Sequence, residues 1–310
     1  MPKLYIDEFV GISNRLEVLP LAFALQKAHG HEIVLDWHEL DSFSVDGTRR
    51  GKVRLLARIG AERVRDCDRA RFDALAGRKM ILRSLDGPPE LLDPIYLETG
   101  RRVKLAPHLA EHIRTTFSAL NGRPLVGVHV RHGDYTLGDE NTYRVDREWP
   151  AVPVWWYAET MRAIKRAQPD VAFFLSSTGD PRAFSELYEG LDVISLSMRS
   201  PYGYKGNDHA SEVNPVADLF ALACCPTILA TPISGYSHWA ANVLGPPSDC
   251  LVPLDGATRE QPLRGLVHLY GSRLPRWRAA GRTGSDTQAL GLPDGFGGVR
   301  LDRPADFGWL

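Results

Sequence analysis

The chain has 310 residues, 44% of them hydrophobic and 24% charged, which is the composition of a globular protein with room for two domains. The formal net charge of −1 excludes a global positive field that would draw the protein to nucleic acid or to an acidic membrane. No apolar run approaches the length of a membrane span, and no signal-peptide core follows the first residues, so we expect a soluble, cytoplasmic protein. The four cysteines form no Cys-x-x-Cys pair and no Cys/His spacing suited to zinc, which favours a reducing compartment and no metal site.

The first half of the chain alternates predicted strands and helices. We expect strands at 4–6, 32–37 and 79–82, and helices at 16–29 and 107–120. A glycine-containing loop at 9–15 precedes the first helix, and Ser13 or Asn14 is expected to cap that helix. Such a loop, facing a helix N-terminus, is a favourable place for an anion. The arginine-rich stretch 49–75 is expected to form amphipathic helices and loops with a solvated charged face.

The second half repeats the alternation. We expect strands at 126–130, 171–175, 193–195, 227–231 and 251–252, and helices at 155–167, 215–223 and 238–244. The pattern predicts an α/β protein of two doubly wound, Rossmann-like domains facing a cleft. We place the domains at 1–115 and 116–265. Residues 266–310 show no periodicity and are expected to form a tail that crosses back over the core or is partly disordered.

One strand ends in chemically active residues. The buried strand at 126–130 contains His129, and Arg131, His132, Gly133 and Asp134 follow at once. Ligands of open α/β sheets bind beyond the carboxyl ends of the strands, so these side chains are expected to reach a binding site. Arginine can donate two parallel hydrogen bonds to phosphate oxygens, and glycine permits a close approach of the backbone.

Two families share this motif in part. His129-Val-Arg131-His-Gly133-Asp134-Tyr135 resembles the His-x-Arg-x-Gly-Asp-Tyr motif of the fucosyltransferase superfamily, which covers α1,2-, α1,6- and protein O-fucosyltransferases. The shorter Arg131-His132-Gly133 resembles the signature of histidine phosphatases, in which the histidine is the phosphorylated nucleophile. The phosphatases carry this signature near the start of their domain, whereas more than one hundred residues precede it here. A phosphatase also needs a second, later histidine, for which this chain offers His209, His238 and His268.

Two further motifs favour the fucosyltransferases. Gly11-x-x-Asn14-Arg15-Leu16 resembles the Gly-x-Gly-Asn-Arg/Gln loop that opens their N-terminal domain, with Ile12-Ser13 in place of the second glycine. Asp218 stands on a predicted helix sixteen residues before Ser234, as in their C-terminal motif, and Gly235-Tyr236-Ser237 follows. The resemblance implies the two-Rossmann GT-B architecture, with an N-terminal acceptor domain and a C-terminal nucleotide-sugar domain.

The resemblance also implies an activity, namely the transfer of fucose from the donor substrate GDP-fucose to a carbohydrate or glycoconjugate acceptor, with inversion and as a step of bacterial glycan biosynthesis. Arg131 would be catalytic, and the substrate-binding residues would be Gly11, Asn14, Arg15, His129, Gly133, Asp134, Asp218, Ser234, Gly235, Tyr236 and Ser237. No cofactor and no metal are expected, since no Asp-x-Asp pair suits a metal-bound diphosphate, although Asp7-Glu8 leaves a metal open.

Three questions stay open at this level. The catalytic base would be a carboxylate near the loops, and the available ones are Asp7, Glu8, Glu17 and Asp134. A protein that binds a GDP-sugar without turnover would show the same motifs. The sequence does not distinguish fucose from another GDP-linked sugar.

Overall fold

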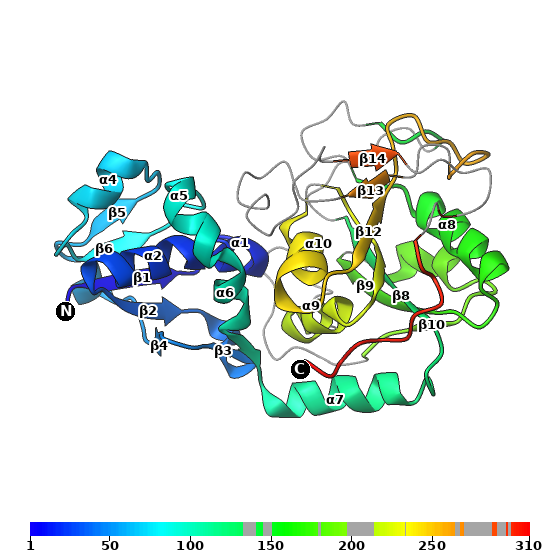
Figure 1. The fold of residues 1–310 in the computed structure, drawn as a ribbon, viewed down its shortest axis with the longest axis horizontal. Coiled ribbons are helices and arrows are strands. Elements are labelled where there is room, and N and C mark those ends of the chain that lie inside the picture. Colours follow the sequence, from blue (N-terminus) through cyan, green and yellow to red (C-terminus); the bar gives the residue numbers. More distant parts are fainter. Residues whose placement is uncertain are drawn as a thin grey trace. The chain divides into compact units, whose positions relative to one another are not determined.

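The computed structural model describes residues 1–132, 141–144, 151–178, 181–196, 214–232, 234–263, 267–269, 287–289, 296 and 299–310. These residues form two compact units, Met1–Ala106 and the described part of 107–310 (Figure 1). None of the helices in these ranges combines the length and the apolar character that a bilayer crossing requires.

Unit 1 is built on a five-stranded parallel sheet in the order β4-β2-β1-β6-β5. The strands are β1 (Lys3–Asp7), β2 (Glu32–Asp36), β4 (Arg49–Arg50), β5 (Glu62–Val64) and β6 (Met80–Leu82). The helices are α1 (Ile12–Leu16), α2 (Leu19–His29), η1 (His38–Asp41), α3 (Leu55–Arg58), α4 (Arg69–Ala74), α5 (Pro89–Leu92), η2 (Asp93–Ile95) and α6 (Tyr96–Arg101). A separate antiparallel pair joins β3 (Phe43–Val45) to β7 (Val103–Leu105).

Two local predictions for unit 1 are corrected. The helix expected at 16–29 is split into α1 and α2, because Pro20 lacks the N–H that a continuous helix needs at that point. The stretch 49–75 contains the short strands β4 and β5 besides its helices. Strands of two and three residues are too short to show an alternating pattern, and Arg49 and Arg50 at the sheet edge are both exposed.

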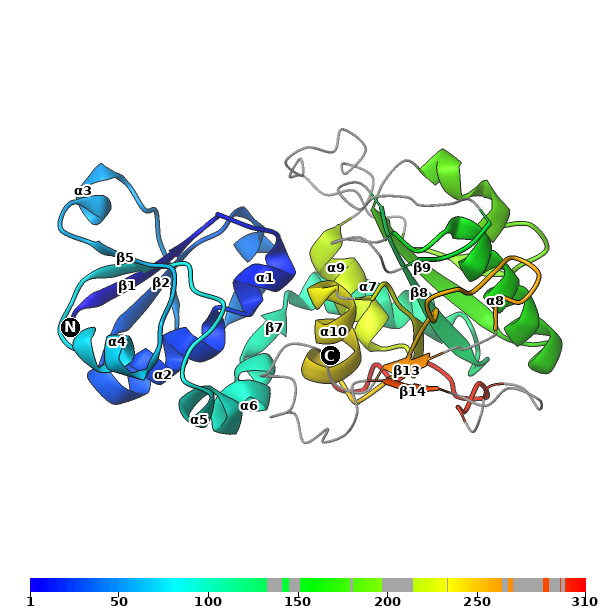
Figure 2. The same ribbon diagram turned by 90° about the horizontal axis from the view of Figure 1, so that it is seen from above.

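Unit 2 is built on a seven-stranded sheet in the order β10-β9-β8-β11-β12-β13-β14, in which the first five strands pair in parallel and the last two pairings, β12 with β13 and β13 with β14, are antiparallel. The strands are β8 (Leu125–Arg131), β9 (Ala172–Thr178), β10 (Val193–Ile194), β11 (Thr227–Leu229), β12 (Asp249–Val252), β13 (Val267–Leu269) and β14 (Thr287–Ala289). The helices are α7 (Pro107–Ser118), α8 (Val154–Ala167), η3 (Pro181–Leu187), α9 (Pro215–Ala223), α10 (Gly235–Trp239) and the π-helix η5 (Ala240–Leu244). Helices α8 and α9 cover opposite faces of this sheet (Figures 1 and 2).

The predicted domain limits differ from the observed units. The boundary expected between 115 and 116 falls inside α7, which belongs to unit 2 as a whole. The apolar stripe of α7 explains its place, because Phe117 packs edge-on against Phe174 of β9 with ring centroids 5.5 Å apart.

The described parts of 266–310 also belong to unit 2. Strands β13 and β14 extend the sheet, and residues 299–310 pack on its core. Trp309 stacks on Phe220 of α9 at 5.9 Å, and Arg303 pairs with Asp249 at 2.6 Å. This segment lacks periodicity because single side chains attach it to unit 2. A helix or strand would instead pack one continuous face on the core and so show a repeating apolar pattern.

Candidate functional site

Strand β8 has two chemically different faces, because successive side chains of a strand point to opposite sides of the sheet. One face contributes three valines to the apolar cluster that includes α8, namely Val126, Val128 and Val130. Gly127, His129 and Arg131 alternate with them on the face covered by α9. A Cβ atom at Gly127 would lie 2.6 Å from Leu222 Cδ1, so α9 packs directly on this strand. His129 and Arg131 therefore lie at the carboxyl end of β8, on the face of the sheet covered by α9.

His129 is buried and joins β8 to α10. Its Nδ1 lies 2.7 Å from the Ser237 hydroxyl, and its ring stacks on that of Tyr236 with centroids 4.7 Å apart. Burial, with a smaller contribution from the charge of Arg131, lowers the pKa of His129 to about 3. The imidazole is therefore neutral at physiological pH and contributes a hydrogen bond, not a charge, to the site.

Asp218 places a carboxylate in the interior of unit 2. Helix α9 begins at Asn214, whose side-chain oxygen accepts hydrogen bonds from the N–H groups of Val216 and Ala217, both at 3.1 Å. Asp218 lies one turn further on and is only 5% exposed. Burial raises the pKa of Asp218 to about 7, and a hydrogen bond from Ser176 at the end of β9 partly offsets this rise.

Helix α10 brings Ser234, Gly235, Tyr236 and Ser237 to the same edge. Ser234 stands at its N-cap without a side-chain capping bond, and the Tyr236 hydroxyl donates to the Pro215 carbonyl at 2.8 Å. That bond ties the start of α10 to the start of α9. Parallel register also places Ser176 beside His129, so Asp218, Ser176, His129 and Ser237 form one connected group.

The loop motif of unit 1 is arranged differently from the expectation. Gly11 is the N-cap of α1, and no side chain caps α1 or α2, so capping by Ser13 or Asn14 is wrong. Asn14 is exposed, whereas Arg15 is buried and lies over the Trp37 ring at 5.2 Å. Gly11 takes part through its backbone alone, since its carbonyl accepts from the N–H of Arg15 at 3.1 Å, as the carbonyl of any N-cap residue does.

Arg15 takes part in an ion-pair network with three residues that follow β1 and β2. It is bonded to Glu39 and lies 3.7 Å from Glu8, and the His38 ring contacts Glu8 as well. The ligand atoms of Glu8, His38 and Glu39 lie within 4.8 Å of one another, a spacing that also suits a metal ion. The Arg15 guanidinium already supplies positive charge to both carboxylates, so a cation would have to compete with it.

The four carboxylates considered as bases have distinct surroundings. Asp7 accepts two hydrogen bonds from Arg83, at 2.7 and 3.0 Å, and pairs with Arg58 at 3.1 Å. These arginines outweigh burial and lower the pKa of Asp7. Glu17 is buried and accepts a hydrogen bond from Tyr96 at 2.8 Å. Glu8 is partly exposed. Asp134 lies outside the described residues, as does Gly133.

His132, directly after β8, is held in one tautomer. Its Nε2 lies 3.0 Å from the Val152 carbonyl, which can only accept, so this nitrogen carries the proton. Burial lowers the pKa of His132, and its ring packs edge-on against Phe184 at 5.4 Å. Of the later histidines, His238 is buried on α10, and the side chains of His209 and His268 lie outside the described set.

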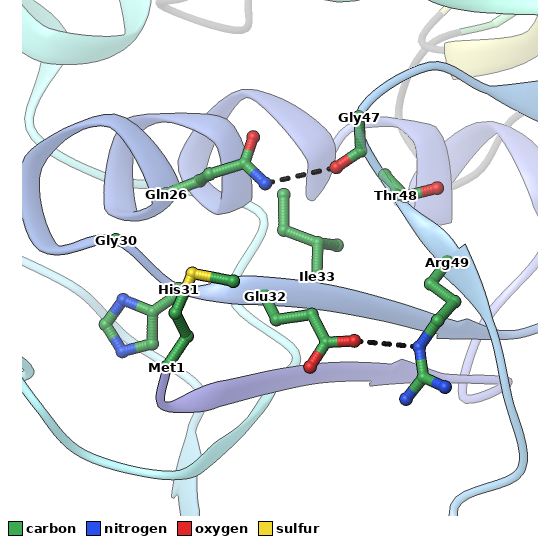
Figure 3. A pocket seen from close by; sticks show the side chains of 9 residues that line it. All are labelled: Met1, Gln26, Gly30, His31, Glu32, Ile33, Gly47, Thr48 and Arg49. Carbon is green, nitrogen blue, oxygen red and sulfur yellow. Dashed lines mark hydrogen bonds and ion pairs between the residues drawn. The ribbon is translucent and has the colours of Figure 1, made fainter.

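A shallow cavity of about 310 Å³ lies elsewhere in unit 1 (Figure 3). It opens at the amino ends of β1 and β2, where Gln26 donates to the Gly47 carbonyl at 3.1 Å and Arg49 pairs with Glu32 at 2.8 Å. Since ligands of parallel sheets bind at the carboxyl ends, this cavity is separate from the candidate site.

Comparison with solved structures identifies the fold. The α1,6-fucosyltransferase NodZ with GDP matches with a TM-score of 0.50 and 16% identity, over 82% of this chain and 96% of NodZ. NodZ from Bradyrhizobium, in another structure, matches with the same TM-score and identity, over 82% and 95%. A variant of FUT1 from Arabidopsis thaliana in complex with GDP has a TM-score of 0.52 and 10% identity, over 83% of this chain and 71% of FUT1. This chain has the fold of the fucosyltransferase-like GT-B glycosyltransferases.

The GT-B fold confirms the predicted α/β class with two Rossmann-like units. No family model matches the sequence, and no curated protein is significantly similar to it. Three residues that contact the site in unit 2 were not predicted from the sequence: Ser176 is bonded to Asp218, and Thr231 and Tyr157 are bonded to the His129 carbonyl. Ser176 follows the predicted strand at 171–175 and Thr231 ends the predicted strand at 227–231, which is a usable signal, whereas nothing in the sequence marks Tyr157 within its helix.

Proposed function

We propose that this protein is a glycosyltransferase that transfers fucose from GDP-fucose to a hydroxyl group of a glycan or another acceptor, with inversion and without a metal. The observation that carries the proposal is that a buried carboxylate, Asp218, is bonded to Ser176, which lies opposite His129 on β8, two residues before Arg131. The NodZ and FUT1 structures with this fold contain GDP, which supports GDP as the nucleotide.

Asp218 would select guanine as the nucleobase of the donor. A carboxylate accepts two hydrogen bonds from the N1–H and N2–H groups of guanine, whereas uracil offers one N–H between two carbonyl oxygens. A buried carboxylate without such donors is costly, so the preference for guanine is strong. We assign the diphosphate to Arg131 and to the α10 segment with Ser234 and Ser237.

Arg131 would stabilise the leaving group of the transfer reaction. In the transfer, the bond between the anomeric carbon and the β-phosphate oxygen breaks, and its electron pair stays on GDP. A guanidinium directed at that oxygen stabilises the growing negative charge, which is the role a metal ion fills in other enzymes. The acceptor oxygen attacks the opposite face of the sugar, which gives inversion, and its proton passes to a base. Asp7 is bonded to two arginines, Glu17 to Tyr96 and Glu8 to His38, so each of these three carboxylates would have to leave a partner to act as the base.

Calorimetric titration of GDP, UDP and inorganic phosphate in the presence of a chelator tests the nucleotide assignment. Wild type is expected to prefer GDP. Arg131→Ala should weaken GDP binding by about 10- to 100-fold, because a charge-assisted hydrogen bond contributes about 1.5–3 kcal/mol. Asp218→Ala should abolish the preference for GDP over UDP.

Arg300→Ala is the matched control, since Arg300 is exposed and pairs only with Asp302 among the described residues. Wild type that binds GDP no better than UDP would contradict the guanine assignment. Phosphate binding lost in His132→Ala would instead favour the phosphatase.

A further inference from the structure

Strand β8 extends further than its neighbour β11. The register pairs Leu229 with Val128, and β11 ends there, while β8 continues to Arg131. The N–H of Ala230 donates to Leu251 on β12, so in a continued ladder the backbone of Thr231 would face β8 opposite Val130. Its N–H would then donate to the His129 carbonyl, and its carbonyl would accept from the N–H of Arg131.

The side chain of Thr231 makes both of these bonds in place of its backbone. Its hydroxyl donates to the His129 carbonyl at 3.0 Å and accepts from the N–H of Arg131 at 3.1 Å. The Thr231 carbonyl is thereby released and accepts from the N–H of Ser234 at 3.4 Å, which starts the turn into α10. One hydroxyl thus keeps β8 paired up to Arg131 while the chain of β11 turns away.

Tyr157 of α8 completes the arrangement from the opposite face of the sheet. Its hydroxyl lies 3.0 Å from the His129 carbonyl and 3.0 Å from the Thr231 hydroxyl. Tyr157, Thr231 and His129 are at most 2% exposed, so water does not compete for these bonds. On the other side of β8, Arg131 pairs with Thr178 of β9.

We propose that Thr231, supported by Tyr157, is a positioning residue that fixes the backbone of Arg131 and so directs its guanidinium to the β-phosphate of the nucleotide. The inference rests on the proposed function. A general stabilising role would affect binding of the whole nucleotide. In the proposed role, loss of the Thr231 hydroxyl weakens binding of the β-phosphate and leaves binding of guanine unchanged.

The test compares the affinities of the full-length protein for GDP and GMP, which differ by the β-phosphate alone. Wild type should bind GDP more tightly, and Arg131→Ala should abolish that difference. Thr231→Val keeps the shape but removes the hydroxyl, and it should lower the GDP-to-GMP affinity ratio by about tenfold with GMP affinity unchanged. Thr231→Ser should restore the ratio to within about twofold, and Tyr157→Phe should lower it by about threefold because Thr231 still makes both bonds.

Two matched controls separate positioning from stability. Thr227→Val makes the same change at the other end of β11, where the hydroxyl donates to the Arg300 carbonyl at 3.4 Å. Thr160→Val removes a buried hydroxyl of α8 that has no hydrogen-bond partner among the described residues. Both should leave the ratio unchanged. A Thr231→Val ratio equal to that of wild type, or equal losses for GDP and GMP, would overturn the inference. Wild type without a preference for GDP over UDP would instead overturn the proposed function.

Discussion

At the scale of one residue, Asp218 combines a structural cost with the binding role proposed for it. Its carboxyl group has a usual pKa of 3.8, and burial raises the pKa to about 7. Between about pH 4 and pH 7 the unfolded chain has lost this proton while the folded chain keeps it. The contribution of Asp218 to the free energy of unfolding therefore falls as the pH rises through this window, and the loss is complete above about pH 7.

Replacement of Asp218 by the isosteric amide should separate the two roles. Asp218→Asn should be more stable than wild type at pH 8, with a difference that shrinks toward pH 5, because the amide never ionises. GDP affinity of wild type should rise from pH 6 to pH 8 as the carboxylate forms, and that of the variant should be weak and independent of pH. Urea midpoints and titrations at four pH values measure both effects. A stability difference that does not change with pH would contradict the shifted pKa.

The packing of α9 on β8 sets the geometry of the site at the scale of an element. Gly127 allows this contact, since a Cβ there would lie 2.6 Å from Leu222 Cδ1 and 3.0 Å from Cys225 Cβ. Gly127→Ala should therefore destabilise the protein by about 1–3 kcal/mol and weaken GDP binding, because α9 carries Asp218. Gly308→Ala is the control, with its nearest atom 3.8 Å away. A urea midpoint equal to that of wild type would show that α9 adjusts without cost.

Periodicity and motifs predicted the elements that carry the site, and their limits have physical causes. Strand β8 was predicted from its apolar run and α9 from the proline at its start, whereas the helix expected at 238–244 begins three residues earlier, as α10 followed by η5. The Thr231 bonds to β8 escaped prediction because they depend on the register of strands one hundred residues apart. The domain boundary was placed inside α7 because the apolar side chains along one face of a helix do not indicate which of two sheets that face covers. Residues 266–310 lack periodicity, although 299–310 pack firmly.

The whole molecule contains two Rossmann-like units, and the function proposed for it is a transfer reaction rather than binding alone. Release of GDP from GDP-fucose in the presence of an acceptor library tests this most directly. Wild type should release GDP and form a fucosylated product. Arg131→Ala should be slower by about 10²- to 10³-fold, as is typical when one donor to a developing anion is lost, and His132→Ala should stay near wild type. Turnover in Arg131→Ala at the rate of wild type, or GDP bound by wild type without any release from GDP-fucose, would contradict the proposed enzyme.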